Sequence, residues 1–142
     1  MADQLTLLVK NSMGEISLAT EAASQWLSDR KLSPRIDYLP CLAIEELVTN
    51  CIKYAYEAGE EHVITIELKS VDSTLVLSVT DDGRPFNPLE APVPKLDLPP
   101  EERPVGGLGI HLLRQFADRI EYARVNGRNR VTVWMQCKTS SD

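Results

Sequence analysis

The chain has 142 residues, of which 43% are hydrophobic and 25% are charged, and 21 acidic against 15 basic residues give a net charge of −6. This size and composition are typical of one globular domain, so we expect residues 1–142 to fold as a single domain. The negative net charge argues against direct nucleic-acid binding, which needs clustered lysine and arginine. No apolar run approaches the roughly 18 residues of a membrane span, and the N-terminus lacks the basic and then apolar layout of a signal peptide.

The three cysteines are odd in number and form no Cys-x-x-Cys or Cys/His cluster of the kind that binds zinc. On one helix, Cys41 and Cys51 would lie about 15 Å apart at roughly 1.5 Å per residue, which is beyond disulfide reach. Cys137 is far from both in the sequence. We therefore expect reduced thiols and a soluble protein of the cytoplasm.

The first two predicted elements are a strand and a helix. Leu5, Leu7 and Val9 alternate with other residues, which is typical of a strand. Residues 12–15, Ser-Met-Gly-Glu, have the form of a capping box, which predicts the start of a helix. Apolar residues then recur at helical spacing, namely Ile16, Ala19, Ala23, Trp26 and Leu27.

A second helix follows after a short connection. We expect it to begin at Asp37, with Pro40 in its first turn, although Ser33-Pro34 is an alternative start. It runs to about Tyr56, and Ala58-Gly59 ends it. Its apolar residues form one stripe on the helix surface, namely Ile44, Leu47, Val48, Cys51, Ile52 and Ala55.

An antiparallel hairpin comes next, with strands near residues 63–68 and 75–79 around a turn at 71–73. Asp82 to Val105 is then a segment of 24 residues that holds seven of the nine prolines. A structureless segment of that length in a compact domain is usually a lid or a binding loop. No apolar periodicity anchors it, so we expect it to be mobile.

The last part of the chain predicts a helix and two strands. Gly106-Gly107-Leu108-Gly109 opens the helix, and strands near 121–125 and 130–137 are joined around Asn126-Gly127. The helix is marked by five apolar residues, Leu112, Leu113, Phe116, Ala117 and Ile120. The whole order predicts an α+β, two-layer sandwich, in which three helices cover one face of a mixed, mainly antiparallel sheet of about five strands.

Glu46 and Asn50 are four residues apart on the second helix and therefore project together, roughly opposite the apolar stripe. A carboxylate in such a place can take a proton, and an amide oxygen can ligate a hard cation. Two solvated polar residues on a helix surface would give the same pattern, so the pair needs support from elsewhere in the chain.

Two further motifs give that support. Asp81-Asp82-Gly83 ends a strand, where it is either an ordinary turn or a carboxylate that accepts a hydrogen bond from an amino group beside a flat ring. The glycines of residues 106–109 open a helix, where they are either a hinge or backbone donors for an anion. No Lys-Ser or Lys-Thr follows them, which excludes a P-loop.

Together the three motifs resemble those of the GHKL ATPase superfamily, which has the Bergerat ATP-binding fold. Within it, the chain is most similar to the anti-sigma factor serine/threonine kinases of the RsbW and SpoIIAB type. The shared segments are residues 45–50, 81–88 and 106–110, and the likeness extends over nearly the whole chain.

The resemblance implies that the chain binds ATP and Mg²⁺. Asn50 would ligate the Mg²⁺, Glu46 would act as the general base, and Asp81 would receive the adenine amino group. The other residues that the resemblance places at the nucleotide are Gly83, Lys53, Gly106, Gly107, Leu108 and Gly109, with residues 82–105 as a lid that closes over it. Lys53 could equally be a solvated surface lysine with no contact to the nucleotide.

Some positions depart from the superfamily pattern, among them Asn87, which stands where the anti-sigma kinases often have an aspartate. Arg84-Pro85 replaces the usual second glycine after Gly83, a variation that the anti-sigma kinases share. Asn129 stands where many relatives have a threonine near the adenine, and its contact is left unassigned. The two histidines do not lie in a phosphoacceptor helix, and we expect His111 to be a packed helix residue rather than a catalyst.

By resemblance, the chain would phosphorylate a STAS-domain antagonist of an anti-sigma factor and bind a sigma factor, as a homodimer. It would bind neither nucleic acid nor membranes. The alternatives are an ATP-dependent binding switch without catalysis, and a histidine-kinase-type ATPase module that acts on a separate domain.

Overall fold

The computed structural model describes residues 3–30, 34–90 and 108–137. Its elements in chain order are β1 (Asp3–Lys10), α1 (Gly14–Ser28), α2 (Pro34–Asn50), the π-helical turn η1 (Cys51–Ala55), β2 (Val63–Val71), β3 (Thr74–Asp81), the 3₁₀ turn η2 (Pro88–Glu90), α3 (Leu108–Phe116), β4 (Arg119–Val125) and β5 (Arg128–Gln136). The predicted α+β class is confirmed. In this described part of the chain, no helix is both long and apolar enough to cross a membrane.

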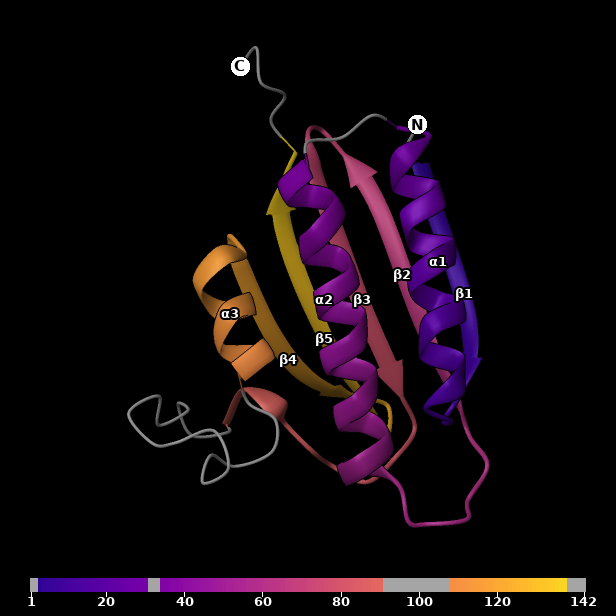
Figure 1. Cartoon of the computed structure of the whole chain (residues 1–142). Helices are drawn as coiled ribbons and strands as arrows, with labels where there is room; N and C mark the ends of the chain where they lie inside the picture. Colours follow the sequence, from indigo (N-terminus) through magenta and orange to yellow (C-terminus); the bar gives the residue numbers. More distant parts are fainter. Residues whose placement is uncertain (1–2, 31–33, 91–107, 138–142) are drawn as a thin grey trace, which may run out of the picture.

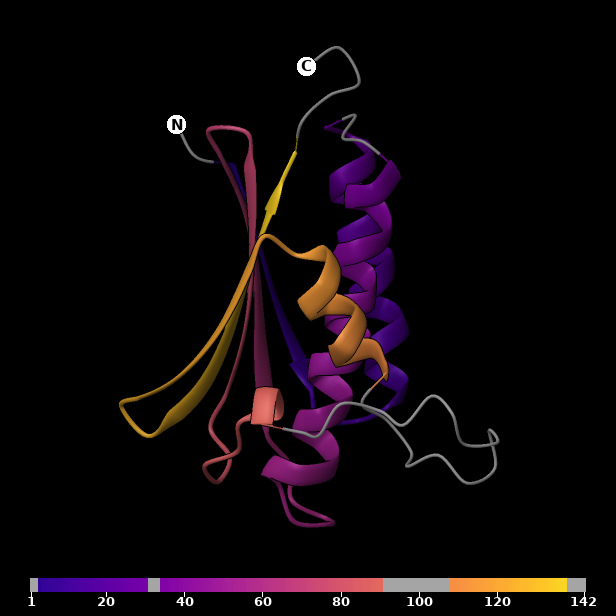
Figure 2. The same ribbon diagram turned by 90° about the vertical axis from the view of Figure 1, so that its left-hand side faces the viewer.

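The five strands form one sheet in the order β1-β2-β3-β5-β4, and each neighbouring pair is antiparallel. The sheet was predicted to be mixed and mainly antiparallel; the described sheet has about the expected number of strands but no parallel pair. All three helices lie on one face of the sheet, as expected (Figure 2). The other face carries no helix among the described residues.

The core lies between the sheet and the helices because alternate strand residues point inward. Ile66, Val79 and Val131 are paired across β2, β3 and β5 and form one buried row of this face. Fully burying a side chain of this size stabilises the fold by roughly 1.5–3 kcal/mol. The inward positions of these three strands are otherwise filled by Ile64, Leu68, Leu75, Leu77, Val133 and Met135, and near one end of the sheet by Asp81 and Asn129. Those last two are the buried polar exceptions.

Helix α1 buries the predicted apolar stripe, but the predicted capping box does not form. The residue before the first helical turn is Met13, whose side chain makes no capping hydrogen bond. Instead, the Ser12 N–H donates to the Lys10 carbonyl oxygen at 2.8 Å, and the Lys10 N–H donates to the Glu15 carboxylate at 3.4 Å. A tight turn after β1 therefore replaces the reciprocal bonds of a capping box.

Helix α2 begins at Pro34, so the preferred start at Asp37 was wrong and the alternative is confirmed. Pro40 consequently lies inside the helix rather than in its first turn. Past Asn50 the helix continues without a break as the π-helical turn η1, which ends at Ala55. Such turns are rare and are frequent at functional sites.

The third predicted helix extended too far. Helix α3 ends at Phe116, and Ile120 lies in β4, where it pairs with Val133. The turn between β4 and β5 is at Asn126 and Gly127, as predicted, with positive φ angles of 53° and 75°. Of the predicted lid, residues 82–90 are described and contain η2, whereas residues 91–105 lie outside the described residues.

Candidate active site

The residues of the three motifs come from elements that meet at one end of the molecule. The C-terminal end of α2, the end of β3, the start of β5 and the start of α3 all lie at this end (Figure 1). A cavity opens here between the helix layer and the sheet. Its lining residues are Leu47, Asn50, Cys51, Ala55, Val79, Asp81, Phe86, Pro88, Asn129 and Val131.

Asp81 is the last residue of β3 and lies at the polar end of this cavity, with 4% of its surface exposed. Its Oδ1 accepts hydrogen bonds from the Gly83 N–H and from Asn129 Nδ2, each at 2.9 Å. Its Oδ2 accepts one from the thiol of Cys51 at 3.1 Å. A buried carboxylate surrounded by donors in this way is suited to accept one more hydrogen bond from an amino group in the cavity.

Gly83 follows Asp81 and packs against the end of η1. A β-carbon at this position would overlap the backbone carbonyl group of Ala55. The Arg84 N–H donates to the same carbonyl oxygen at 2.9 Å. Close approach to the backbone of Ala55 therefore requires glycine here. The predicted role of Gly83 in giving a flat ring room stays a prediction.

Glu46 and Asn50 both lie at this end of α2, but they face different neighbours. Asn50 lines the cavity, whereas Glu46 is half-buried against the first turn of α3. A β-carbon on Gly109 would overlap the carboxyl-bearing end of the Glu46 side chain. The glycine motif and the helix carboxylate, 63 positions apart in the sequence (109 − 46), are therefore in direct contact.

The environment of Glu46 suits a proton acceptor. Burial raises the pKa of its carboxyl group above the ordinary value, and the negative charge of Glu45 raises it further, while Lys53 partly offsets both. A carboxylate whose pKa is raised in this way is a better base than an exposed one. Lys53 itself is exposed and does not line the cavity.

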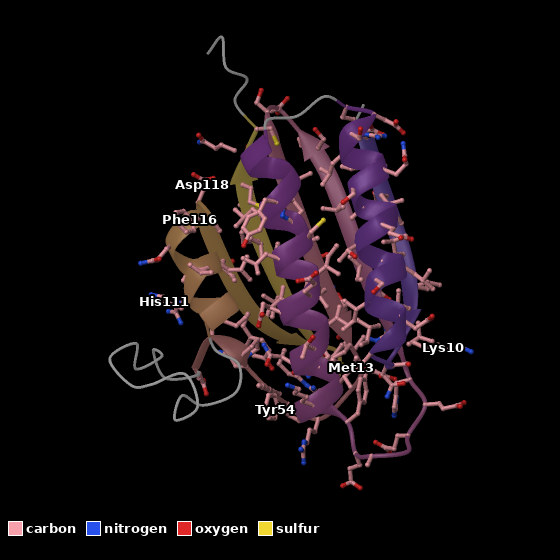
Figure 3. The ribbon with its side chains drawn as sticks, viewed as in Figure 1. Lys10, Met13, Tyr54, His111, Phe116 and Asp118 are labelled. Carbon is pink, nitrogen blue, oxygen red and sulfur yellow. The ribbon has the colours of Figure 1, made fainter. Side chains whose placement is uncertain are left out.

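The remaining predicted site residues lie at the start of α3. Leu108 is the first residue of the helix, and Gly109 contacts Glu46 as described above. Gly106 and Gly107 lie outside the described residues. His111 projects from the side of α3 that faces away from α2, whereas Tyr54 lies at the C-terminal end of the α2–η1 helix (Figure 3). The expectation that His111 is not a catalyst stays a prediction.

The residues that fit an adenine nucleotide are present. The cavity offers apolar walls from Leu47, Val79 and Val131 together with the Asp81 carboxylate, a combination that suits a flat ring with an amino group. Asn50 adds an amide oxygen at the same cavity, which is a ligand type that Mg²⁺ accepts. The described residues contain no group of three or more His, Cys, Asp or Glu that could hold a metal ion. A cation at Asn50 would therefore need further oxygen ligands, such as those of phosphate groups.

Sequence reasoning missed several residues around Asp81. Cys51 was placed in the apolar stripe, and Asn129 was left without a contact. A signal for Asn129 was available, since it has the same parity as Val131 and Val133 on β5 and must point inward with them. Tyr122 on β4 donates its hydroxyl hydrogen bond to Asn129 Oδ1, and no pattern in the sequence predicted this contact.

Comparison with known proteins also indicates an ATPase-type domain. A family model described as histidine kinase-like ATPase domain matches residues 9–136. The serine/threonine-protein kinase BtrW of Bordetella bronchiseptica is 26% identical over 126 residues, which cover 84% of this chain and 89% of that protein. The anti-sigma F factor of Caldanaerobacter subterraneus subsp. tengcongensis is 29% identical over 100 residues, or 69% of each chain.

A solved structure supports the fold independently. The structure of the RsbU and RsbW domains of a Mycobacterium tuberculosis protein superimposes with a TM-score of 0.64 at 14% identity. The match covers 94% of this chain and 32% of that longer chain. At this identity the likeness establishes the fold alone.

Proposed function

Since this chain belongs to the histidine kinase-like ATPase domain family, we propose that it is a serine/threonine protein kinase of the anti-sigma factor type. Its substrate is a STAS-domain antagonist of an anti-sigma factor, and the exchange of partners that follows controls a sigma factor. Two similar proteins are named a serine/threonine-protein kinase and an anti-sigma F factor, which supports this class. We extend the proposal to a single-domain chain that acts as a homodimer in the cytoplasm.

Base recognition rests on Asp81. Among the described residues, its Oδ2 accepts one hydrogen bond, from a thiol, which is a weak donor, so it can also accept a hydrogen bond from the adenine amino group. The apolar side chains of Leu47 and Val131 line the same cavity and exclude water from the ring. Gly83 keeps the backbone close to Ala55 and so helps to shape the wall of the cavity.

Phosphate binding rests on the end of α2 and the start of α3. Asn50 offers its amide oxygen to the metal ion from the cavity wall. Lys53, one turn further on, is exposed and free to reach a phosphate. Mg-ATP, when bound, supplies the phosphoryl group and the charge neutralisation that transfer requires. The residues proposed to flank the phosphates are Gly106, Gly107, Leu108 and Gly109.

Glu46 is the proposed general base. It orients the attacking hydroxyl group of the substrate protein and accepts its proton as the new oxygen–phosphorus bond forms, the bond between the γ-phosphorus and the bridging oxygen of ATP breaks, and ADP leaves. The raised pKa makes its carboxylate a stronger base, and its contact with Gly109 holds it at the helix start where the phosphates are expected. Phosphoryl transfer needs mainly this kind of positioning, and little covalent chemistry from the protein.

The observation that carries the proposal is the contact of Glu46 with Gly109 beside a cavity lined by Asn50 and Asp81. The test is to incubate the protein with Mg-ATP and small STAS-domain proteins and to search for phosphoserine or phosphothreonine by mass spectrometry. We expect acid-stable phosphate on a STAS protein with the wild-type chain and none with Glu46→Ala.

Two other outcomes would redirect the proposal. Partner binding that survives Glu46→Ala but is lost in Asn50→Ala would indicate an ATP-dependent binding switch without catalysis. Acid-labile phosphohistidine on a partner would indicate a histidine-kinase-type module. Transfer that is unchanged in Glu46→Ala would overturn the assignment of the base.

A further inference from the structure

We propose that Asn129 is a positioning residue that fixes the carboxylate of Asp81 and thereby sets the preference for a 6-amino purine over a 6-oxo purine. The inference rests on the proposed nucleotide binding and goes beyond it to the origin of base selectivity. Asn129 is the second residue of β5 and is directly paired with Asp81 on β3. Only 2% of its surface is exposed.

The amide oxygen of Asn129 is surrounded by donors. It accepts hydrogen bonds from the Tyr122 hydroxyl at 2.6 Å, from Arg124 Nη1 at 3.1 Å and from the Phe86 N–H at 3.2 Å. Rotating the amide by half a turn would place its NH₂ group against these three donors. The orientation of the side chain is therefore determined by its surroundings.

The amide nitrogen of Asn129 is equally committed. It donates one hydrogen bond to Asp81 Oδ1 at 2.9 Å and the other to the carbonyl oxygen of Arg84 at 2.8 Å. A side-chain amide has two hydrogens to donate, so none is left for a ligand. Asn129 therefore acts on the base through Asp81 rather than by direct contact.

The consequence for Asp81 is that its two oxygens are unequal. Oδ1 is held by two strong donors, the Gly83 N–H and Asn129 Nδ2, whereas in the described part of the chain Oδ2 receives only the Cys51 thiol. Burial and the neighbouring Asp81 charge raise the pKa of Cys51 well above its usual range, so the thiol stays protonated as a donor. The oxygen with remaining capacity is therefore Oδ2, and it cannot exchange places with Oδ1 unless the bond to Asn129 breaks.

A fixed carboxylate oxygen discriminates between bases. It accepts a hydrogen bond from the amino group of adenine, whereas the 6-oxo group of hypoxanthine would place a second acceptor against it. Burying an unpaired acceptor is costly, and this cost is the source of the selectivity. If the Asp81 carboxylate is free to turn, it no longer opposes the 6-oxo group, so the penalty against hypoxanthine falls. Its hydrogen bond to the adenine amino group also weakens, so the preference for adenine decreases.

The experiment compares ATP with inosine triphosphate, which carries the 6-oxo group, by equilibrium binding in the presence of Mg²⁺. Asn129→Asp keeps the shape of the side chain but replaces both donated hydrogen bonds with a second carboxylate facing Asp81. At about pH 8, where Arg124 favours the ionised form of that carboxylate, we expect the preference for ATP to fall about tenfold or more. Asn126→Asp makes the same chemical change in the exposed turn three positions away and should leave the preference intact.

The pH dependence separates positioning from a general packing role. In Asn129→Asp, lowering the pH protonates the introduced carboxyl group, which restores one donated hydrogen bond and part of the ATP preference. Loss of packing alone would weaken ATP and inosine triphosphate equally and would show no such recovery. Tyr122→Phe removes one donor to the Asn129 oxygen and is expected to lower the preference by about two- to fivefold. If Asn129→Asp does not fold, Tyr122→Phe therefore tests whether Asn129 positions Asp81.

If the preference for ATP over inosine triphosphate is unchanged in folded Asn129→Asp and Tyr122→Phe, the inference about Asn129 is wrong, but the proposed function still stands. Failure of the wild-type chain to bind ATP at all would overturn the proposed function, and the inference with it.

Discussion

Gly109 lies directly against the carboxyl-bearing end of Glu46, with no room for a β-carbon between them. The first turn of α3 and the side chain of the proposed base on α2 are therefore packed directly against each other. Since α3 includes Leu108 and Gly109 of the glycine motif, a shift of the helix start on nucleotide binding would change the position of the Glu46 carboxylate. This contact joins two of the three sequence motifs in one piece of structure.

Gly109→Ala tests this contact. The added methyl group would meet the flexible end of a side chain rather than backbone, so it should displace the Glu46 carboxylate without unfolding the chain. We expect the rate of phosphoryl transfer to fall about tenfold or more, because small misplacements of catalytic groups are costly. Stability should stay level or rise by up to about 1 kcal/mol, because alanine is the better helix former.

The control for Gly109→Ala is a double-mutant cycle with Glu46→Ala. Once the carboxylate is absent, the extra methyl group should cost nothing further in the rate. Additive losses in the double variant would show that Gly109 acts through something other than Glu46.

The pH dependence of transfer should report the ionisation of Glu46. Burial and Glu45 raise its pKa, and the base is active only when deprotonated, so the rate should increase with pH through this raised value. Glu45→Gln should move the rising limb to lower pH, and Lys53→Gln should move it to higher pH. Glu46→Gln should abolish the limb and reduce kcat by about 10²- to 10⁴-fold. If the rising limb of the pH–rate profile stays at the same pH in both Glu45→Gln and Lys53→Gln, the group that titrates is not Glu46.

The regular elements could be predicted because burial on one side imposes a period on the sequence. The α1 stripe from Ile16 to Leu27 and the alternation in β2 and β3 both follow this rule. Boundaries were less predictable. Ile120 continues the helical spacing of α3, yet pairing with Val133 on β5 draws it into β4, so tertiary contact overrides the local pattern.

Some residues of the candidate site could likewise be predicted from the sequence, and others could not. Glu46, Asn50 and Asp81 belong to motifs that can be read along the chain. Asn129 reaches Asp81, and Tyr122 reaches Asn129, only because β5 lies between β3 and β4 in the sheet, and no local signal specifies that strand order. The residues that position the carboxylate are therefore a product of topology.

Asp82 should make the fold sensitive to acid. Burial alone would raise its pKa, but hydrogen bonds with Tyr56 at 3.0 Å and with His62 at 3.1 Å lower it below the ordinary value of 3.8. A lowered carboxyl pKa stabilises the fold above that ordinary value, and the contribution is lost as the pH falls through the folded-state pKa. Since Asp82 is half-exposed, Asp82→Asn should reduce the free energy of unfolding at neutral pH by less than about 1 kcal/mol.

Urea unfolding at a series of pH values would check this prediction. The difference between wild type and Asp82→Asn should shrink as the pH falls below 3.8, the ordinary value. Tyr56→Phe, which removes one of the two hydrogen bonds, should give a smaller difference with the same pH dependence. A difference that stays constant at low pH would mean that the charge of Asp82 does not contribute.

Cys51 offers a separate test of where the base binds. Its thiol donates to Asp81 Oδ2 and lines the cavity, so both its polarity and its size should matter. Cys51→Ser keeps a donor of similar size, and we expect its affinity for ATP to stay within about threefold of wild type. Cys51→Val removes the donor and adds bulk where the ring is expected, which should weaken ATP binding about tenfold or more, because extra volume in a fitted site costs about 1–3 kcal/mol. Isothermal titration with Mg-ATP measures both, and thermal unfolding establishes that each variant is folded. Equal affinities in the two variants would mean that the adenine ring lies away from Cys51, and the proposed part of Asp81 in base recognition would then be wrong.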